Sequence, residues 1–300
     1  MPKGLSIHVG VNEPDSSFQM PKLKGCVNDA NTMRQIAEKR GFQPQAVLEN
    51  AAAGFHAVRD AVTKAADDLD AGDIFLFTFS GHGSTQPTLA TDEPDRQDET
   101  ILLFDCVLID NYLRRVLWSK FKPSVRILGV SDCCHAGTVL FSINFTNFVD
   151  SVTSAFRSVS RGIIAAFAPN NFSRADETAS IRTREFNRVQ RDKIIALKPN
   201  IHDEIRNEIL TQGADLQGTL LTLAACRDDE KALDGDDNGA FTKALDAVLR
   251  GINPPKNYNE LMTQITNNLA VNGINTQHPI LFSKANTDTD AFLGEVPFTI

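Results

Sequence analysis

Short apolar runs alternate along the chain with longer segments whose apolar residues recur at helical spacing. The runs that predict strands span residues 5–11, 46–48, 73–79, 100–104, 125–130, 219–225 and 279–282. The segments that predict helices span residues 29–39, 55–69, 110–117, 203–210, 239–249 and 259–269. Strands that alternate with helices predict an α/β fold, in which a mostly parallel central sheet carries helices on both faces.

The pattern weakens over residues 140–217, which we interpret as a long insertion that is partly helical. Regular alternation resumes beyond it. Residues 1–139 and 218–300 are therefore expected to contribute strands to one sheet within a single domain.

The charge of the chain is unevenly distributed. The net charge is −8, yet the stretch from Arg157 to Lys198 holds nine Lys or Arg against four Asp or Glu, a local charge of +5. Phe172 and Phe186 are the only aromatic residues in or beside the most basic part, whereas single-stranded nucleic acid is bound by interleaved aromatics. A nucleic-acid-associated module is thus a weak alternative, and we expect no nucleic-acid partner.

The composition also indicates the cellular compartment in which the protein is expected. The longest uncharged apolar stretches, such as residues 74–79 and 163–168, are far shorter than the roughly 20 residues of a membrane-spanning helix. Residues 1–8 lack a signal-peptide core, so we expect a cytoplasmic protein without membrane association. Five cysteines, an odd number, predict free thiols.

Two of the apolar runs end in reactive side chains. His82 follows the run at 73–79, and Cys134 follows the run at 125–130. Sites in open parallel sheets form at the carboxyl ends of the strands, so these side chains can meet there. Cysteine attack on a peptide carbonyl requires a thiolate, a proton shuttle and N–H donors for the oxyanion. The residues alone leave a second interpretation open. In it Cys134 is a small buried apolar side chain, and His82 is a polar side chain whose hydrogen bonds are satisfied within the fold.

Several segments resemble, in order, the motifs of caspase-like peptidases. Residues 77–83 (Phe-Thr-Phe-Ser-Gly-His-Gly) resemble the strand and His-Gly turn of that family, and residues 132–137 (Asp-Cys-Cys-His-Ala-Gly) resemble the metacaspase form of its cysteine motif. Further similarity lies at residues 25–30, 98–101, 226–229 and 239–242. The chain is thereby identified as a member of the metacaspases or orthocaspases. The resemblance implies the caspase-like fold, with residues 1–139 similar to the large subunit and residues 218–300 to the small subunit.

The same resemblance assigns the chemistry. It implies that Cys134 is the nucleophile and His82 its partner, with the backbone N–H groups of Gly83 and Cys134 as oxyanion donors. Cys133 occupies a neighbouring position, and His135 should point away because adjacent side chains leave a strand on opposite faces. A metal at these three adjacent residues is not expected, since they cannot all face one ion. No cofactor is required.

The resemblance further implies an acidic pocket for the P1 residue, which precedes the cleaved bond. Asp29 and Asp132 would form its floor, and Asp228 or Asp229 a further wall. Carboxylates bind a guanidinium bidentately and an ammonium as a point charge, so the expected partners are protein or peptide substrates with Arg, and less favourably Lys, at P1. Asp29 has a second interpretation as a helix N-cap, because a helix is predicted to begin there.

Two calcium sites were considered. Residues 234–239 begin like an EF-hand loop, but Leu245 stands at the twelfth position where that loop needs Glu, so we interpret them as an acidic turn before a helix. The resemblance implies a different set of four acids, of which Asp98 and Asp110 match two. We therefore expect at most a weak calcium site and a modest calcium effect.

An arginine-rich insertion in an arginine-directed peptidase is itself a candidate substrate. We expect residues 140–217 either to occupy the active-site cleft as an autoinhibitory segment or to be cut, as in a zymogen. The candidate cleavage positions are Arg174, Arg182, Arg184, Arg188 and Arg191. The alternative is a well-packed helical insertion whose arginines are solvated.

The rival function is a catalytically silent caspase-fold scaffold that binds partners through the insertion. A scaffold has no need of His82, Cys134 and Asp132 together, so their co-occurrence favours the peptidase. A monomer is expected rather than a dimer.

Overall fold

The computed structural model describes residues 2–87, 97–134, 182–227, 229–284 and 289–300. Within these residues the main sheet has six strands in the order β2-β1-β3-β7-β8-β9. They are β1 (Gly4–Gly10), β2 (Gln43–Glu49), β3 (Ile74–Ser80), β7 (Arg126–Asp132), β8 (Thr219–Ala224) and β9 (Ile280–Lys284). Neighbouring strands run parallel except β9, which is antiparallel to β8. The predicted α/β fold is confirmed, and strands from both sides of the insertion share one sheet.

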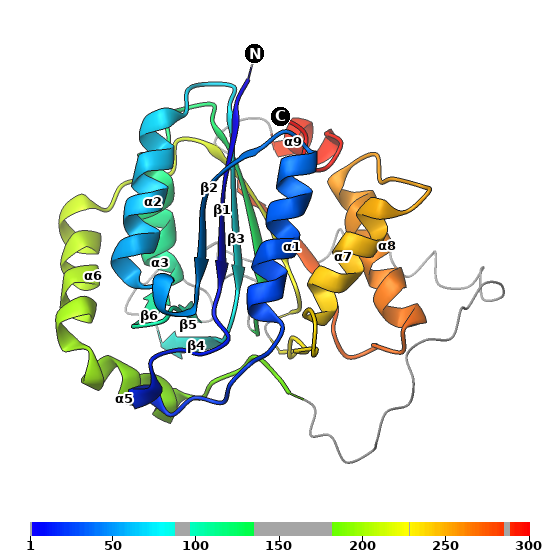
Figure 1. The fold of residues 1–300 in the computed structure, drawn as a ribbon. Helices are drawn as coiled ribbons and strands as arrows, with labels where there is room; N and C mark the ends of the chain where they lie inside the picture. Colours follow the sequence, from blue (N-terminus) through cyan, green and yellow to red (C-terminus); the bar gives the residue numbers. More distant parts are fainter. Residues whose placement is uncertain (1, 88–96, 135–181, 228, 285–288) are drawn as a thin grey trace.

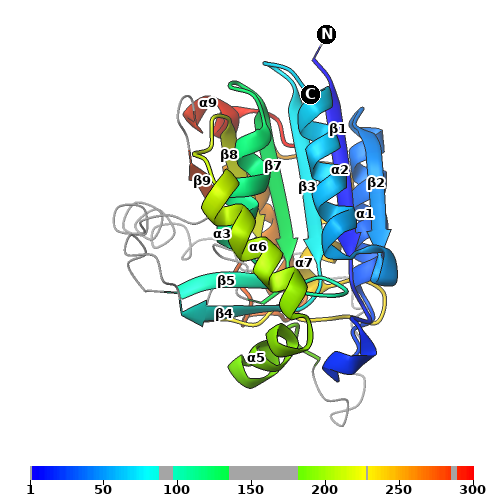
Figure 2. The same ribbon diagram turned by 90° about the vertical axis from the view of Figure 1, so that its left-hand side faces the viewer.

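Helices cover both faces of this sheet (Figures 1 and 2). One face carries α1 (Cys26–Lys39), α7 (Ala240–Arg250), α8 (Tyr258–Val271) and α9 (Thr289–Gly294). The other carries α2 (Phe55–Asp68), α3 (Asp110–Tyr112) and α6 (Pro199–Gln212). The helix expected over residues 110–117 is α-helical only in α3, and Leu113–Leu117 continues it as a π-helix. No helix in the described part of the chain is long and apolar enough to cross a membrane.

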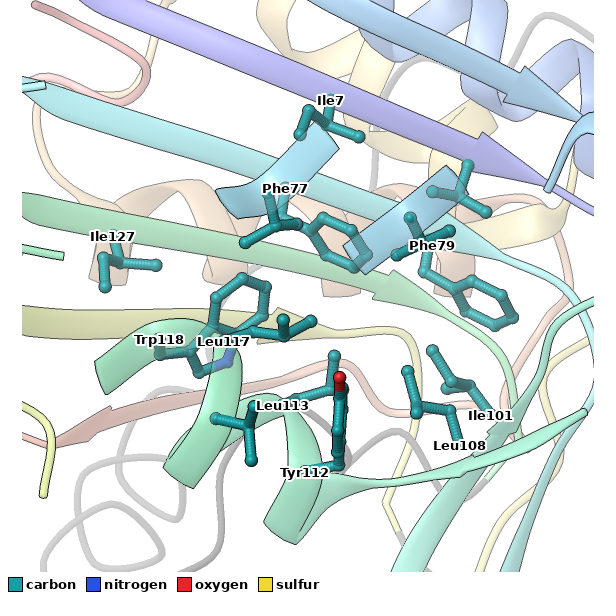
Figure 3. Close-up of a cluster of buried hydrophobic side chains, with 14 of the residues drawn as sticks. Ile7, Phe77, Phe79, Ile101, Leu108, Tyr112, Leu113, Leu117, Trp118 and Ile127 are labelled. Atoms are coloured by element: carbon teal, nitrogen blue, oxygen red, sulfur yellow. The ribbon is translucent and has the colours of Figure 1, made fainter. Parts of the chain in front are cut away.

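Strand β3 is buried along its whole length. Its side chains alternate between two cores: Phe77 and Phe79 belong to the cluster under α2, and Leu76 belongs to the cluster under α1 and α7. Figure 3 shows Phe77 packed beside Trp118, with their ring centroids 5.3 Å apart. Burying a side chain of this size stabilises the fold by about 1.5–3 kcal/mol, so both cores anchor the strand that leads into His82.

A second sheet lies at the carboxyl ends of the main strands (Figure 2). It contains β4 (Gly83–Pro87), β5 (Gln97–Leu102) and β6 (Val107–Ile109), all antiparallel. The strand expected over residues 100–104 is β5, which begins and ends earlier and lies in this second sheet instead of the central one. The sequence Gly-Ser-Thr-Gln-Pro of β4 has no alternation of apolar residues, so the partner of β5 gave no signal.

The described end of the insertion is more ordered than its sequence pattern predicted. The helix α5 (Arg188–Leu197) begins with a capping box, in which Asn187 and Gln190 bond each other's backbone N–H. The helix expected over residues 203–210 is α6, which is longer at both ends. Figure 1 shows α5 below the carboxyl ends of the main strands, so this described part of the insertion lies near the edge at which those strands end.

Candidate active site

His82 and Cys134 follow two neighbouring strands. In the parallel pairing of β3 with β7, Ser80 lies opposite Asp132 at the ends of the strands. His82 and Cys134 each come two residues after this pair. The two side chains that the sequence singled out therefore leave the same edge of the sheet at the same level, as sites in parallel sheets do.

The His82 imidazole is buried and oriented by one hydrogen bond. Its Nε2 lies 2.8 Å from the carbonyl oxygen of Pro21, which accepts the Nε2 proton. Nδ1 is then the unprotonated nitrogen, and it has no hydrogen-bond partner among the described residues. Burial lowers the pKa of His82, while the backbone carbonyls of Pro21 and Arg184 partly oppose this. A neutral imidazole with a free Nδ1 can accept a proton from a thiol.

Cys133 and Cys134 point into different cores. Cys133 packs in the cluster under α2, and Cys134 in the cluster under α1 and α7, as alternation predicts for adjacent residues. The Cys134 Sγ accepts a hydrogen bond from the Ala232 N–H at 3.2 Å. Burial raises the pKa of this thiol to about 12, and hydrogen bonds with the backbones of Ala232 and Arg184 oppose the rise. Cys134 is therefore a thiol in this conformation and needs a base to become a thiolate.

The guanidinium of Arg184 is fully buried among three carboxylates, called here the carboxylate cluster: Asp29, Asp132 and Asp234. Its Nη2 donates to Asp29 Oδ2 at 2.8 Å and to Asp234 Oδ1 at 3.1 Å. Its Nη1 lies 2.8 Å from Asp132 Oδ1 and donates to Ser80 Oγ at 2.8 Å. Burial alone would lower the pKa of Arg184, but the carboxylates, Asp132 foremost, raise it well above its usual value.

The start of α7 holds two of these carboxylates in place. The Gly239 N–H and the Asn238 side chain each donate to Asp29 Oδ1 at 2.9 Å. Thr242 donates to Asp132 Oδ2 through its N–H at 3.0 Å and its hydroxyl at 2.7 Å. A Cβ on Gly239 would lie 2.6 Å from Asp132 Oδ2, so only glycine fits there. The backbone of α7 thus orients the acids that face the guanidinium.

The N-cap interpretation of Asp29 was wrong. Helix α1 begins at Cys26 with Gly25 as its N-cap, so Asp29 lies inside the helix. Its carboxylate is turned toward the end of β3, where Oδ2 accepts a hydrogen bond of 2.7 Å from the Ser80 hydroxyl.

The titration of Asp132 depends on the cation beside it. Burial raises the pKa of this carboxyl to about 6. Arg184 and the hydrogen bonds from Thr242 lower the pKa, whereas the negative charge of Asp29 raises it further. A guanidinium in the carboxylate cluster therefore favours the ionised form of Asp132.

Arg184 belongs to an extended segment, residues 182–186, that pairs with protein backbone on both sides. On the N-terminal side its N–H donates to the Ala232 carbonyl at 3.2 Å, and the Asp234 N–H donates to the Arg182 carbonyl at 3.1 Å. These two bonds pair the segment in the antiparallel manner with residues 232–234.

On the C-terminal side the partner is Gly83. Its N–H donates to the Arg184 carbonyl at 2.8 Å, and its own carbonyl accepts from the Phe186 N–H at 3.2 Å. A Cβ on Gly83 would lie 2.1 Å from the Cys134 carbonyl oxygen, so the close approach of the two strand ends requires glycine. The Arg184 backbone also interacts with the side chains of His82 and Cys134. Its carbonyl accepts the Gly83 N–H, which the sequence predicted as an oxyanion donor.

Sequence reasoning missed Asp234, which it interpreted as part of an acidic turn before a helix. Its carboxylate is wholly buried and also accepts the N–H groups of Lys24, at 2.9 Å, and Gly25, at 3.0 Å. The run of acids at 234–237 was the only signal available in the sequence, and it does not indicate which carboxylate turns inward.

Other predicted site residues cannot be placed or lie elsewhere. Asp228, Arg174 and His135 fall outside the described residues, as does the side chain of Asp98. Asp110 is buried at the start of α3, where its Oδ1 accepts the Asn111 N–H at 2.6 Å. Among the described residues no group of three or more potential ligands could hold a metal ion, and the weak calcium site stays a prediction.

The remaining candidate arginines differ in their surroundings. Arg188 and Arg191 lie in α5; Arg188 is exposed, and Arg191 is buried and lies 2.7 Å from an oxygen of Asp192. Arg184 is bound in extended backbone, so binding of Arg188 or Arg191 in the same way would require α5 to unwind. Arg182 lies in the extended segment with about a third of its side chain exposed.

Comparisons with known proteins agree with the fold and show the family. Residues 5–290 match the sequence model of the caspase domain. Metacaspase-9 of Arabidopsis thaliana is 24% identical over 98% of this chain and 97% of its own length. Metacaspase-1A of Aspergillus oryzae is 25% identical over 84% of this chain, which spans 62% of that relative. The crystal structure of protein GSU0716 from Geobacter sulfurreducens covers 100% of this chain and 99% of its own, with a TM-score of 0.73 and 31% identity.

Proposed function

Because this chain belongs to the caspase domain family and to its metacaspase-type cysteine peptidases, we propose that it is an endopeptidase that cleaves after arginine and, less efficiently, after lysine. One observation carries the proposal. The guanidinium of Arg184 lies in the carboxylate cluster while the carbonyl of the same residue accepts the Gly83 N–H. A P1 arginine of a substrate would make the same contacts.

The chemistry follows from the atoms around this peptide. His82 Nδ1 takes the Cys134 proton, and the thiolate attacks the P1 carbonyl carbon. The Gly83 N–H stabilises the resulting oxyanion, with the Cys134 N–H as the second predicted donor. The imidazolium then protonates the leaving amine as the C–N bond breaks. Water hydrolyses the thioester, which releases the new carboxylate and returns the thiol.

The carboxylate cluster explains why arginine is preferred. Arg184 Nη2 contacts Asp29 and Asp234, and Nη1 contacts Asp132, so the two terminal nitrogens of one planar group meet three carboxylates. An ammonium is a single point charge on a shorter stem and cannot contact all three at these distances. Lysine substrates therefore bind with fewer charge-assisted hydrogen bonds.

The chain's own residues 182–186 act as the first occupant of this site. While they remain there, they bury Cys134 and exclude a second peptide. The peptidase is then inactive. It becomes active either when the 184–185 peptide bond is cut or when residues 182–186 leave the site.

The test is a panel of fluorogenic peptides that differ only at P1, assayed with wild type and Cys134→Ala. We expect cleavage after Arg to exceed cleavage after Lys by roughly tenfold, with none after Asp, and no activity in the variant. Preference for Asp at P1 would refute the acidic pocket. A purified chain that binds these peptides but cuts none, under any condition that exposes Cys134, would favour the catalytically silent scaffold.

A further inference from the structure

Gln277 is a buried polar side chain that belongs to neither the catalytic pair nor the carboxylate cluster. It lies three residues before β9 and is 1% exposed. Its Nε2 donates to the carbonyl oxygen of Ala225 at 3.1 Å, and its Oε1 accepts the Leu233 N–H at 3.1 Å. The side chain thus joins the residue after β8 to the residues that pair with the 182–186 segment.

The peptide unit that Gln277 holds also meets the P1 residue. The carbonyl of Ala232 and the N–H of Leu233 belong to one planar trans peptide, so they point in opposite directions. Gln277 binds the N–H, and the carbonyl accepts the Arg184 N–H at 3.2 Å. Rotation of this peptide would weaken both hydrogen bonds together. Gln277 therefore fixes the direction in which the carbonyl faces the P1 N–H.

Ala232 also links Gln277 to the nucleophile. Its N–H donates to Cys134 Sγ at 3.2 Å, which opposes the rise that burial causes in the pKa of the thiol. The hydrogen bond from Leu233 to Gln277 polarises the Ala232 carbonyl and makes it a stronger acceptor. Ala232 contacts both the thiol and the P1 backbone, and Gln277 holds the peptide that follows it.

The contacts on either side show what Gln277 adds. The carbonyl of Leu233 accepts the Ala240 N–H at 3.1 Å, so the start of α7 holds the next peptide. On the other side the Glu230 carboxylate accepts the His278 N–H at 2.7 Å. Within the described part of the chain, Gln277 is the only partner of the Leu233 N–H. The peptide between these two fixed points is therefore oriented by this one side chain.

We propose that Gln277 is a positioning residue for peptide cleavage, which holds the Ala232–Leu233 peptide so that its carbonyl accepts the N–H of the P1 residue. The inference rests on the peptidase function proposed above and adds a residue that acts through the backbone rather than on the reacting atoms. It places a second demand on the substrate, because the P1 residue must supply a backbone N–H as well as a cationic side chain.

The experiment compares two fluorogenic substrates: the peptide Ala-Ala-Arg, and its analogue in which an ester oxygen replaces the N–H of the P1 arginine. Release of the fluorogenic amine after arginine is measured for both with the full chain. For wild type we expect kcat/KM to be about five- to tenfold higher for the amide, because the ester offers no hydrogen to the Ala232 carbonyl. The ratio is taken within one preparation, so it does not depend on how many sites residues 182–186 have left.

Two variants of similar shape separate hydrogen bonding from packing. Gln277→Met removes the amide and should lower the amide-to-ester ratio below about two, since the carbonyl is no longer held toward the P1 N–H. Gln277→Glu should keep the wild-type ratio. A buried carboxyl favours its protonated form, which can accept the Leu233 N–H and donate to the Ala225 carbonyl.

Two further variants control for stability. Gln277→Met leaves two buried backbone groups without partners, so Gln277→Asn is made beside it. The shorter amide leaves room for water, and the same loss of the ratio is expected in whichever variant folds. Phe292→Leu is the matched control, because it weakens the packing against Tyr258 in α9, which Figure 1 shows at the end of the sheet opposite α5. It should lower the melting temperature and retain the wild-type ratio.

The two proposals fail in different ways. A ratio near one in wild type, or the wild-type ratio in folded Gln277→Met or Gln277→Asn, would overturn the positioning role and leave cleavage after arginine intact. Loss of the ratio in Gln277→Glu or Phe292→Leu would assign the effect to packing or stability and overturn the role as well. Absence of Cys134-dependent cleavage of the amide substrate would instead overturn the proposed function itself.

Discussion

The backbone N–H of Gly83 donates a hydrogen bond of 2.8 Å to the carbonyl oxygen of Arg184. The side chain of the same arginine lies in the carboxylate cluster, so one residue is held at both the carbonyl and the guanidinium. These are the two points at which a peptidase must hold a P1 residue, one for chemistry and one for specificity.

Replacement of the predicted catalytic pair should remove peptide hydrolysis. Cys134→Ala leaves no nucleophile and His82→Ala leaves no proton acceptor, so each should lower kcat by about a thousandfold or more. Cys133→Ala is the matched control, because Cys133 packs in the opposite core, and most activity should remain. Initial rates with an arginine peptide measure all three, and full activity in Cys134→Ala would contradict the assignment.

Removing the charge of Asp132 should weaken arginine recognition. Asp132→Asn leaves a buried guanidinium with one fewer charged partner, a loss of about 3 kcal/mol or about a hundredfold in kcat/KM. Thr242→Val should cost less, about tenfold, since it removes only a hydrogen bond that orients the carboxylate. Circular dichroism and thermal melting establish that both variants fold. Unchanged kcat/KM in folded Asp132→Asn would place the P1 side chain elsewhere.

The binding of arginine substrates should weaken in acid. Burial raises the pKa of Asp132 to about 6, and the cation lowers it relative to the same buried carboxyl without a cation. The ionised carboxylate thus binds the guanidinium more tightly than the protonated carboxyl does. This part of the binding free energy is fully present above the higher pKa that Asp132 has in the empty site, and it is lost as the pH falls from there to about 6, the pKa with the guanidinium bound. The KM for an arginine peptide should rise in wild type as the pH falls toward 6, and it should level off below that pH. In Asp132→Asn this rise should disappear, and a rise of equal size would assign it to another group.

His82 and Cys134 could be singled out from the sequence because local pattern determines where buried strands end. Parallel pairing then brings those ends together, whatever the intervening residues are. The contact of Arg184 with Asp29 joins residues 155 positions apart, and no periodicity encodes such a pairing. Five arginines were equivalent candidates in sequence, and burial in the carboxylate cluster distinguishes Arg184.

The errors in the predicted fold have the same origin. The pairing of β4 with β5 is made by backbone groups in a segment without apolar alternation, so the second sheet was not foreseen. Asp234 was assigned to a local turn because acids before a helix usually serve its N-terminus. Its partners are Arg184 and the backbone of Lys24, which come from distant parts of the chain.

Calcium should change activity only modestly. The resemblance places acids at Asp98 and Asp110 but not at the other two positions of the set, and fewer carboxylates bind calcium more weakly. Rates measured with millimolar calcium and with a chelator should differ by less than about threefold. Strict dependence that a chelator reverses would show that the acids have been assigned to the wrong positions.

The last prediction concerns the segment that holds Arg184. In wild type the 184–185 peptide bond should be cut, which gives a new N-terminus at Glu185. Otherwise the intact segment should stay in the site and inhibit cleavage of added peptides. Wild type and Cys134→Ala are incubated side by side and new termini are mapped by mass spectrometry. Because β7 and β8 pair within one sheet, the two fragments should separate on a denaturing gel and not under native conditions.

Arg184→Gln distinguishes an inhibitory segment from an inert one. The variant loses the ion pairs with the carboxylate cluster, so the segment should leave the site more readily and the initial rate on an added arginine peptide should rise severalfold. Arg188→Gln is the matched control, since Arg188 is exposed on α5 and its loss should change neither the rate nor the cleavage pattern. Intact wild type after long incubation, together with equal rates for Arg184→Gln and wild type, would exclude both processing and inhibition. The burial of Arg184 would then be purely structural, and Arg184→Gln should show its main effect as a lower melting temperature.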